Sequence, residues 1–312
     1  MARVSIEGLP RPPARYQPDK AGPCERTGLH FETRDAARAE DLLRSNVLLA
    51  RSISAQSREE GLAARKLSRR LRESSSEGVL CESLASREYL GENRFRIGGA
   101  LWALVDQHPG ARTFTIIPRG WTFQPNELPT VSPSRLIRTL RSALDRVLPT
   151  VRSGFLIGGL HGEFNATENV WSLHFHGLAN GDYLAAVNRL RKLPKYRTRK
   201  GNGDKVQRVK AGRKPISNLP YPLLYLFQSY WPARWYSPTG QRSRYRGRIP
   251  EPFHSDLLLW LDRWRLADIT LMMGLAVSCS GFQVTNGKRA SINDRRGRYL
   301  RRNGSQIPSE PP

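Results

Sequence analysis

The chain has 312 residues, and its 51 lysines and arginines outnumber its 27 aspartates and glutamates, giving a formal net charge of +24. So large a charge repels itself, and we therefore expect a polyanionic partner such as nucleic acid. The longest apolar stretch, residues 269–279, is shorter than the roughly 18 residues that span a bilayer, so no membrane partner is expected. Three widely spaced cysteines form neither a disulfide framework nor a CxxC zinc motif, which favours a reducing, cytoplasmic location.

Composition divides the chain into four regions, residues 1–90, 91–232, 233–284 and 285–312. The first region is basic, and we expect it to be disordered over residues 1–35 and partly helical beyond. One helix is predicted over residues 35–55. A second, over residues 58–77, is mostly charged and would lie either in solvent or along DNA. The third region is predicted to be a helical extension and the fourth a disordered basic tail.

The second region, residues 91–232, is predicted to hold the main domain. Apolar, β-branched and aromatic runs bounded by turn residues predict strands over residues 111–118, 154–165, 170–178 and 206–209. Helical spacing of apolar residues, with Ser132 and Asn180 as caps, predicts helices over residues 133–148, 180–193 and 217–230. The resulting β-α-β-β-α-β order is typical of an α+β, ferredoxin-like split β-α-β fold with an antiparallel sheet. Helices on one face of that sheet would leave the other face for a ligand.

A His-x-His pattern marks the third of these strands. His174 and His176 are two residues apart, so in a strand they point to the same face, where they could hold one divalent metal ion. A chance pattern among six histidines is the alternative. Glu163, near the end of the paired strand, is the preferred third ligand for Mg²⁺ or Mn²⁺. His161 and Glu168 are rivals for that role.

Tyrosines follow in the helix predicted over residues 217–230. Tyr221, Tyr225 and Gln228 would share one face of that helix. Packing of an aromatic face into the core is one interpretation. The nearby histidines and basic loop favour another, in which a tyrosine acts as a nucleophile and Gln228 supports it.

Basic residues are dense around these candidates, because residues 181–250 contain 17 lysines and arginines but only two acidic residues. Interleaved aromatic residues could stack on unpaired bases. Together they predict a groove for single-stranded DNA. The candidates for DNA contacts are Arg189, Arg191, Lys192, Lys195, Arg197, Arg199, Lys200, Lys210, Arg213 and Lys214.

Together these motifs resemble those of the HUH endonucleases, a superfamily of rolling-circle replication initiators, transposases and conjugative relaxases. Residues 113–117 resemble its first strand motif, Glu163 with residues 174–176 its metal motif, and residues 225–228 its tyrosine motif. Gln228 stands where the family usually has lysine. The spacing of Tyr221 and Tyr225 resembles the two-tyrosine branch, in which a second tyrosine attacks in a later round.

The resemblance implies a metal-dependent enzyme. His174, His176 and Glu163 would hold Mg²⁺ or Mn²⁺, and Tyr225 would nick single-stranded origin DNA through a 5′-phosphotyrosine. The expected role is a plasmid or phage rolling-circle replication initiator, with a host helicase for unwinding because the sequence has no P-loop. The alternatives are an HUH transposase or relaxase, a non-catalytic nucleic-acid-binding protein with an RNA-recognition-like sheet, and a structural basic protein.

Overall fold

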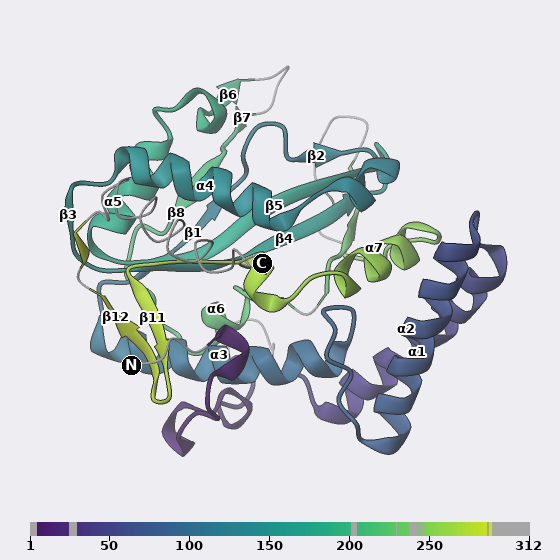
Figure 1. The fold of residues 1–312 in the computed structure, drawn as a ribbon. Coiled ribbons are helices and arrows are strands. Elements are labelled where there is room, and N and C mark those ends of the chain that lie inside the picture. The colour runs from purple at the N-terminus through teal and green to yellow at the C-terminus, as the bar shows by residue number, and fades with distance from the viewer. Residues whose placement is uncertain are drawn as a thin grey trace, which may run out of the picture.

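The computed structural model describes residues 5–24, 30–200, 205–228, 230–236, 243, 246–285 and 287–288. The protein is a mixed α/β structure in which helices lie on both sides of a central sheet (Figure 1). Within these ranges, no helix is both long enough and apolar enough to cross a bilayer.

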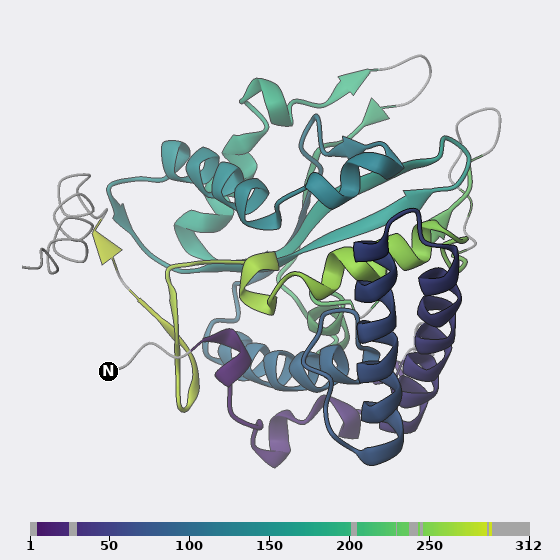
Figure 2. The same cartoon turned by 45° about the vertical axis from the view of Figure 1, so that its right-hand side comes forward.

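The N-terminal part of the described chain is mainly helical, with α1 Arg34–Ser54, α2 Arg58–Glu77 and α3 Arg87–Gln107. Each helix begins after a residue whose hydroxyl accepts a hydrogen bond from the backbone three residues on, and these caps are Thr33, Ser57 and Ser86. The helix predicted over residues 35–55 is thus confirmed. Figure 2 shows α1 and α2 side by side next to α7, Phe253–Asp262.

The second predicted helix is only partly solvated. Although α2 is rich in charge, Ala64, Leu67 and Leu71 are fully buried and belong to the hydrophobic core. Its charged residues also hold it in place, since Arg70 pairs with Asp262 of α7 at 2.9 Å. The prediction underestimated how much of this helix is buried, because three apolar residues among twenty are enough to form a narrow buried stripe.

Disorder over residues 1–35 is also wrong for the part that the structure describes. Residues 5–24 contain three short 3-10 helices, η1 Ile6–Gly8, η2 Ala14–Tyr16 and η3 Pro18–Lys20. Ile6 and Leu9 are buried in the core. Prolines and arginines dominate this segment, but two apolar anchors are enough to fix it on the helices beneath. Residues 25–29 lie outside the described ranges.

Among the described residues, the central sheet has seven strands, β1 Arg112–Ile116, β2 Thr122–Phe123, β4 Leu156–Asn165, β5 Val170–Ala179, β8 Val209–Ala211, β9 Ala233–Arg234 and β10 Thr270–Met273. The order β10-β4-β5-β1-β8 is antiparallel throughout. β2 pairs with β5, and β9 pairs parallel with β4, so the sheet is mixed. The predicted hairpin of residues 154–165 and 170–178 is confirmed as β4 and β5.

Two helices pack together on one side of the sheet, α4 Pro133–Val147 and α5 Gly181–Leu190 (Figure 1). The Ser132 hydroxyl caps α4 as predicted, by accepting from the Arg135 backbone. Asn180 makes no such cap for α5, and its amide donates instead to the His108 carbonyl. The short helix η5 Pro194–Tyr196 follows α5, and β6 Arg199–Lys200 then pairs with β7 Lys205–Val206.

The opposite side of the sheet is not left open, contrary to the prediction. There the short helix α6 Tyr221–Leu224 lies under the sheet, and α3 packs on α6 from the far side (Figure 1). Gly159 permits the approach, since a Cβ atom at this position would come within 2.8 Å of the Leu226 carbonyl oxygen. A helix and a turn thus face the strands that carry the candidate histidines.

The predicted helical extension, residues 233–284, is helical only over α7 and the short η6 Leu266–Ile269. β10 completes the edge of the main sheet beside β4, while β11 Leu275–Ser278 and β12 Gly281–Val284 form a hairpin. A short apolar run suits a buried strand as well as a helix, which explains the error. The predicted boundary at residue 232 therefore divides one sheet.

The remaining elements are the short helix η4 Pro125–Thr130, and β3 Val151–Arg152, which pairs with β13 Gly287–Lys288. β13 lies in the region predicted as a disordered tail. Residues 289–312 of that predicted tail lie outside the described part of the chain.

Burial of Leu67 predicts a large effect of its truncation. Leu67→Ala should lower the free energy of unfolding by about 2–5 kcal/mol, because the substitution leaves a cavity in the core. Leu62→Ala is the matched control in the same helix, since that side chain is 57% exposed. Urea denaturation measures both, and equal midpoints for the two variants would contradict the packing of α2.

Candidate functional site

Three histidines meet on one face of the β4–β5 hairpin. His161 lies directly opposite His174, and His176 is two residues further along β5, so all three point to the same face. Ring centroids are 4.6 Å apart for His174 and His176, 4.9 Å for His161 and His176, and 6.0 Å for His161 and His174. The prediction that His174 and His176 share a face is confirmed, and His161 joins them.

Hydrogen bonds orient two of these rings. His161 Nε2 lies 2.6 Å from the Leu226 carbonyl oxygen and donates to it, and His176 Nδ1 lies 2.9 Å from the Thr115 hydroxyl. Histidines that bind metals commonly engage their second nitrogen in this way. Burial, together with repulsion from His174, lowers the pKa of His161 to about 3, so its ring is neutral at pH 7. Neutral imidazole is the form that binds metals.

The donor set suits a divalent ion in chemistry and approximate spacing. With metal–nitrogen bonds of about 2.0–2.1 Å, two imidazoles on one ion place their centroids roughly 4.5–5.5 Å apart. Two of the three histidine pairs fall within that range, whereas His161 and His174 are wider. In the conformation of the described residues, no group of three or more His, Cys, Asp or Glu is placed to hold an ion. Metal binding would thus require a side-chain rotation that brings His161 and His174 closer.

The predicted third ligand, Glu163, makes different contacts. It lies opposite Ser172, two residue pairs beyond His161 and His174, and its carboxylate is 3.5 Å from Arg234 Nε. The hydroxyl of Tyr236 donates to the other carboxylate oxygen at 3.5 Å. The rival Glu168 accepts from the Asn165 amide in the turn. The register therefore brings His161, and not Glu163, directly opposite a histidine of the His-x-His pair.

The tyrosine helix is much shorter than predicted. It was expected over residues 217–230, but α6 spans only Tyr221–Leu224, and residues 225–227 form a turn. In a continuing helix the Leu226 carbonyl would accept from the Tyr230 backbone. Here that carbonyl accepts from His161, so the end of the helix is tied to the histidine cluster.

The two candidate tyrosines point to different places. The Tyr225 ring lies 4.8 Å from the His176 ring and 6.3 Å from the His161 ring, and its side chain is 38% exposed. The Tyr221 hydroxyl instead donates to the backbone carbonyls of Ala21 and Gly22, at 3.1 and 2.6 Å. Only Tyr225 therefore lies beside the histidine cluster.

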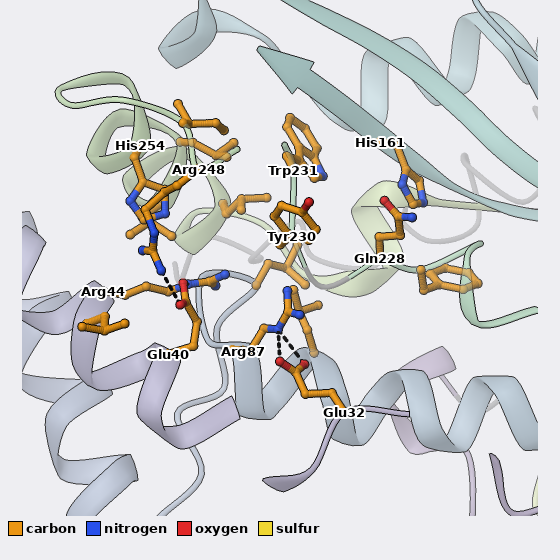
Figure 3. Close-up of a pocket in the computed structure, with 18 of the residues that line it drawn as sticks. Glu32, Glu40, Arg44, Arg87, His161, Gln228, Tyr230, Trp231, Arg248 and His254 are labelled. Atoms are coloured by element: carbon orange, nitrogen blue, oxygen red, sulfur yellow. Dashed lines mark hydrogen bonds and ion pairs between the residues drawn. The ribbon is translucent and has the colours of Figure 1, made fainter. Parts of the chain in front are cut away.

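A cavity of about 540 Å³ adjoins His161. Figure 3 shows His161 and Gln228 on one side of it, and Arg248 and His254 on the other. Leucines from α1 and α7 line its apolar part. Several charged side chains of its rim are paired, as for Arg87 with Glu32 at 2.6 Å. Gln228, predicted to support the tyrosine, thus lines this cavity.

The ten predicted DNA contacts are spread around the molecule. Lys210 of β8 pairs with Thr115 of β1, which in turn pairs with His176, so Lys210 is exposed on the histidine face. Most of the other basic side chains belong to α5, to the segment that follows it, or to the residues after β8. Those at the surface are Arg189, Arg191, Lys192, Arg197, Arg213 and Lys214, whereas Lys195 is half-buried. The side chains of Arg199 and Lys200 lie outside the described part of the structure.

Several partners of the site residues were missed by sequence reasoning. These are the hydrogen bonds of Thr115 with His176 and of the Leu226 carbonyl with His161, and the ion pair of Arg234 with Glu163. Thr115 could have been found from strand pairing, because it lies in a predicted neighbouring strand. The other two depend on the path of the chain after residue 216, for which the sequence offers no comparable signal.

Comparison of the chain with protein-family models, with curated proteins and with solved structures gives no match. The chemistry of the site is therefore inferred from its own residues. A cluster of imidazoles beside an exposed phenol, on the polar face of a sheet in a strongly basic chain, is the feature that any function must explain.

Metal binding should distinguish His161 from Glu163. We expect His161→Ala to weaken Mn²⁺ binding by about tenfold or more, since loss even of groups that support a metal ligand costs about 10–100-fold. Glu163→Gln should leave the affinity unchanged, because Arg234 already holds that carboxylate. Isothermal titration measures both, with His108→Ala as a histidine control outside the cluster. The opposite pattern would make Glu163 the third ligand.

Proposed function

We propose that this protein is a metal-dependent endonuclease that nicks single-stranded DNA through Tyr225. The observation that carries the proposal is the contact of the Tyr225 ring with His176 and His161 in a three-histidine cluster. A nucleophile beside a metal-ligand set is the pairing that phosphoryl transfer to a tyrosine needs. The formal charge of +24 suits a DNA substrate.

The sheet supports the same proposal. In chain order the elements β1-α4-β4-β5-α5-β8 alternate as in a split β-α-β fold, and the spatial order β8-β1-β5-β4 is the one expected for a ferredoxin-like sheet. Helices α4 and α5 lie together on the side away from α6 (Figure 1). β10 and β9 are additions at the β4 edge.

In the proposed reaction, His161, His174 and His176 would hold the ion. Three imidazoles favour Mn²⁺ or a similar ion over Mg²⁺, which prefers oxygen ligands. A bound divalent ion would polarise the scissile phosphate and orient it. The Tyr225 oxygen loses its proton and forms a bond to phosphorus, and the bond from phosphorus to the 3′ oxygen breaks. That oxygen gains a proton, leaving a 5′-phosphotyrosine and a free 3′-hydroxyl that could prime replication.

A rolling-circle replication initiator is the role we propose for this chemistry, with transposition and mobilisation as alternatives that use the same step. An RNA-recognition-like platform is less well supported. Such a platform would expose aromatic residues on the free sheet face. By register, the histidine face of β1, β4, β5 and β8 presents no phenylalanine, tyrosine or tryptophan within the described strands.

Adduct formation tests the proposal. Wild-type protein and Mn²⁺ should convert part of an end-labelled, mixed-sequence single-stranded DNA pool into a covalent DNA–protein species on denaturing gels. Tyr225→Phe should abolish it, because the nucleophilic oxygen is gone. EDTA and the His174→Ala/His176→Ala double variant should do the same.

Tyr221→Phe is the matched control four residues away. It should retain adduct formation, because the Tyr221 hydroxyl binds backbone carbonyls of the N-terminal segment. Loss of the adduct in this variant alone would move the nucleophile to Tyr221. DNA binding without any adduct, equal in EDTA and in the double histidine variant, would leave a non-catalytic binding protein.

A further inference from the structure

Arg94 reaches from α3 to the turn that carries Tyr225. Its Nε donates to the Leu224 carbonyl oxygen at 2.8 Å, and Leu224 immediately precedes Tyr225. Gly98, one helical turn along α3, makes room for this approach, because a Cβ atom there would lie 2.9 Å from the Leu224 side chain. Arg94 is thus fixed to the backbone next to the proposed nucleophile.

The charge of Arg94 is not balanced. Among the residues that the structure describes, Arg94 has no ion-pair partner, and Nε is its only nitrogen in a hydrogen bond. Glu32, the acid whose charge acts on it, is paired with Arg87 at 2.6 Å. The ring of Phe31 lies 5.6 Å from the guanidinium carbon and shields one face of the group. Within the described ranges, the positive charge is therefore partly buried without a carboxylate paired to it.

Such a site favours an anion. Burial, reinforced by repulsion from Arg87, lowers the pKa of Arg94 to about 10, so the protein holds this cation at a cost. An anion would offset that cost. The two terminal amino groups of a guanidinium present donors in a planar fork that matches two oxygens of one phosphate. The Leu226 carbonyl, which accepts from His161, lies two residues beyond the Leu224 carbonyl that accepts from Arg94, so one short turn links the guanidinium to the histidine cluster.

We propose that the terminal amino groups of Arg94 bind a phosphate of the single DNA strand that lies over Tyr225. This assignment rests on the proposed function for the identity of the anion. Arg94 thus has two roles: Nε positions the Tyr225 turn, and the Nη atoms contact the substrate backbone.

DNA affinity at several salt concentrations tests the contact. The experiment uses the full chain with Tyr225→Phe, which prevents adducts, and fluorescence anisotropy of a mixed-sequence single-stranded oligonucleotide pool. Adding Arg94→Gln should weaken binding and reduce the slope of log K against log salt by about 0.7, as expected for one lost phosphate contact on single strands. Arg94→Lys should restore most of the slope, since it keeps the charge.

Arg96→Gln is the matched control on the same helix, because Arg96 pairs with Glu92 at 2.9 Å. It should leave the slope unchanged. A purely structural role would lower the melting temperature of the Arg94→Gln protein and leave its salt slope equal to that of the control. That result would overturn the phosphate contact.

Two parallel measurements separate this inference from the proposed function. If wild type forms no adduct but Arg94→Gln still reduces the salt slope, the phosphate contact stands and nicking fails. If wild type forms the adduct and Arg94→Gln changes neither affinity nor slope, nicking stands and the contact fails. Titration with inorganic phosphate tests the other source of the anion. The DNA assignment would be refuted if phosphate bound to wild type but not to Arg94→Gln and the single-stranded DNA did not compete with phosphate for that site.

Discussion

The pairing of β4 with β5 is the constraint on which the rest of the site depends. Ten residue pairs fix its register, from Leu156 opposite Ala179 to Asn165 opposite Val170. Side chains alternate between the two faces of a strand, so a slip of β5 by one residue against β4 would turn His174 and His176 into the layer under α4 and α5. The same slip would expel Phe175 from the core, which makes it costly. Core packing on one face therefore fixes polar chemistry on the other.

The hydrogen bond from His161 to the Leu226 carbonyl fixes the position of the turn that contains Tyr225 relative to the β4–β5 hairpin. It joins the strand to a turn 65 residues further along the chain. Because the turn is held there, Tyr225 stands against the imidazoles while its side chain keeps contact with solvent. Helix α3 also holds this segment, because Arg94 donates a hydrogen bond to the Leu224 carbonyl. The geometry of the site thus results from a sheet, a turn and a helix that fix one another.

Local patterns were sufficient to predict the elements that bury a regular face. The alternation in residues 170–178 and the Ser132 cap of α4 are examples, and both are confirmed. The position of His161 could also have been predicted, since a polar turn at residues 166–169 places His161 opposite His174. The remaining elements depend on contacts between segments that are far apart in the sequence. The helix ends at Leu224, and the Leu226 carbonyl beyond it accepts from His161; the apolar run from Thr270 is a strand paired with β4.

That edge has a consequence for how the molecule is made. β4 emerges from the ribosome long before β10, its antiparallel neighbour over Leu156 to Gly159. Until β10 arrives, the nascent chain presents unpaired backbone groups along this edge of β4, a surface that invites pairing with other chains. The late strand β10 then pairs with this edge and satisfies its backbone groups. Completion of the sheet is thereby delayed until Thr270–Met273 has been synthesised, more than 100 residues after β4.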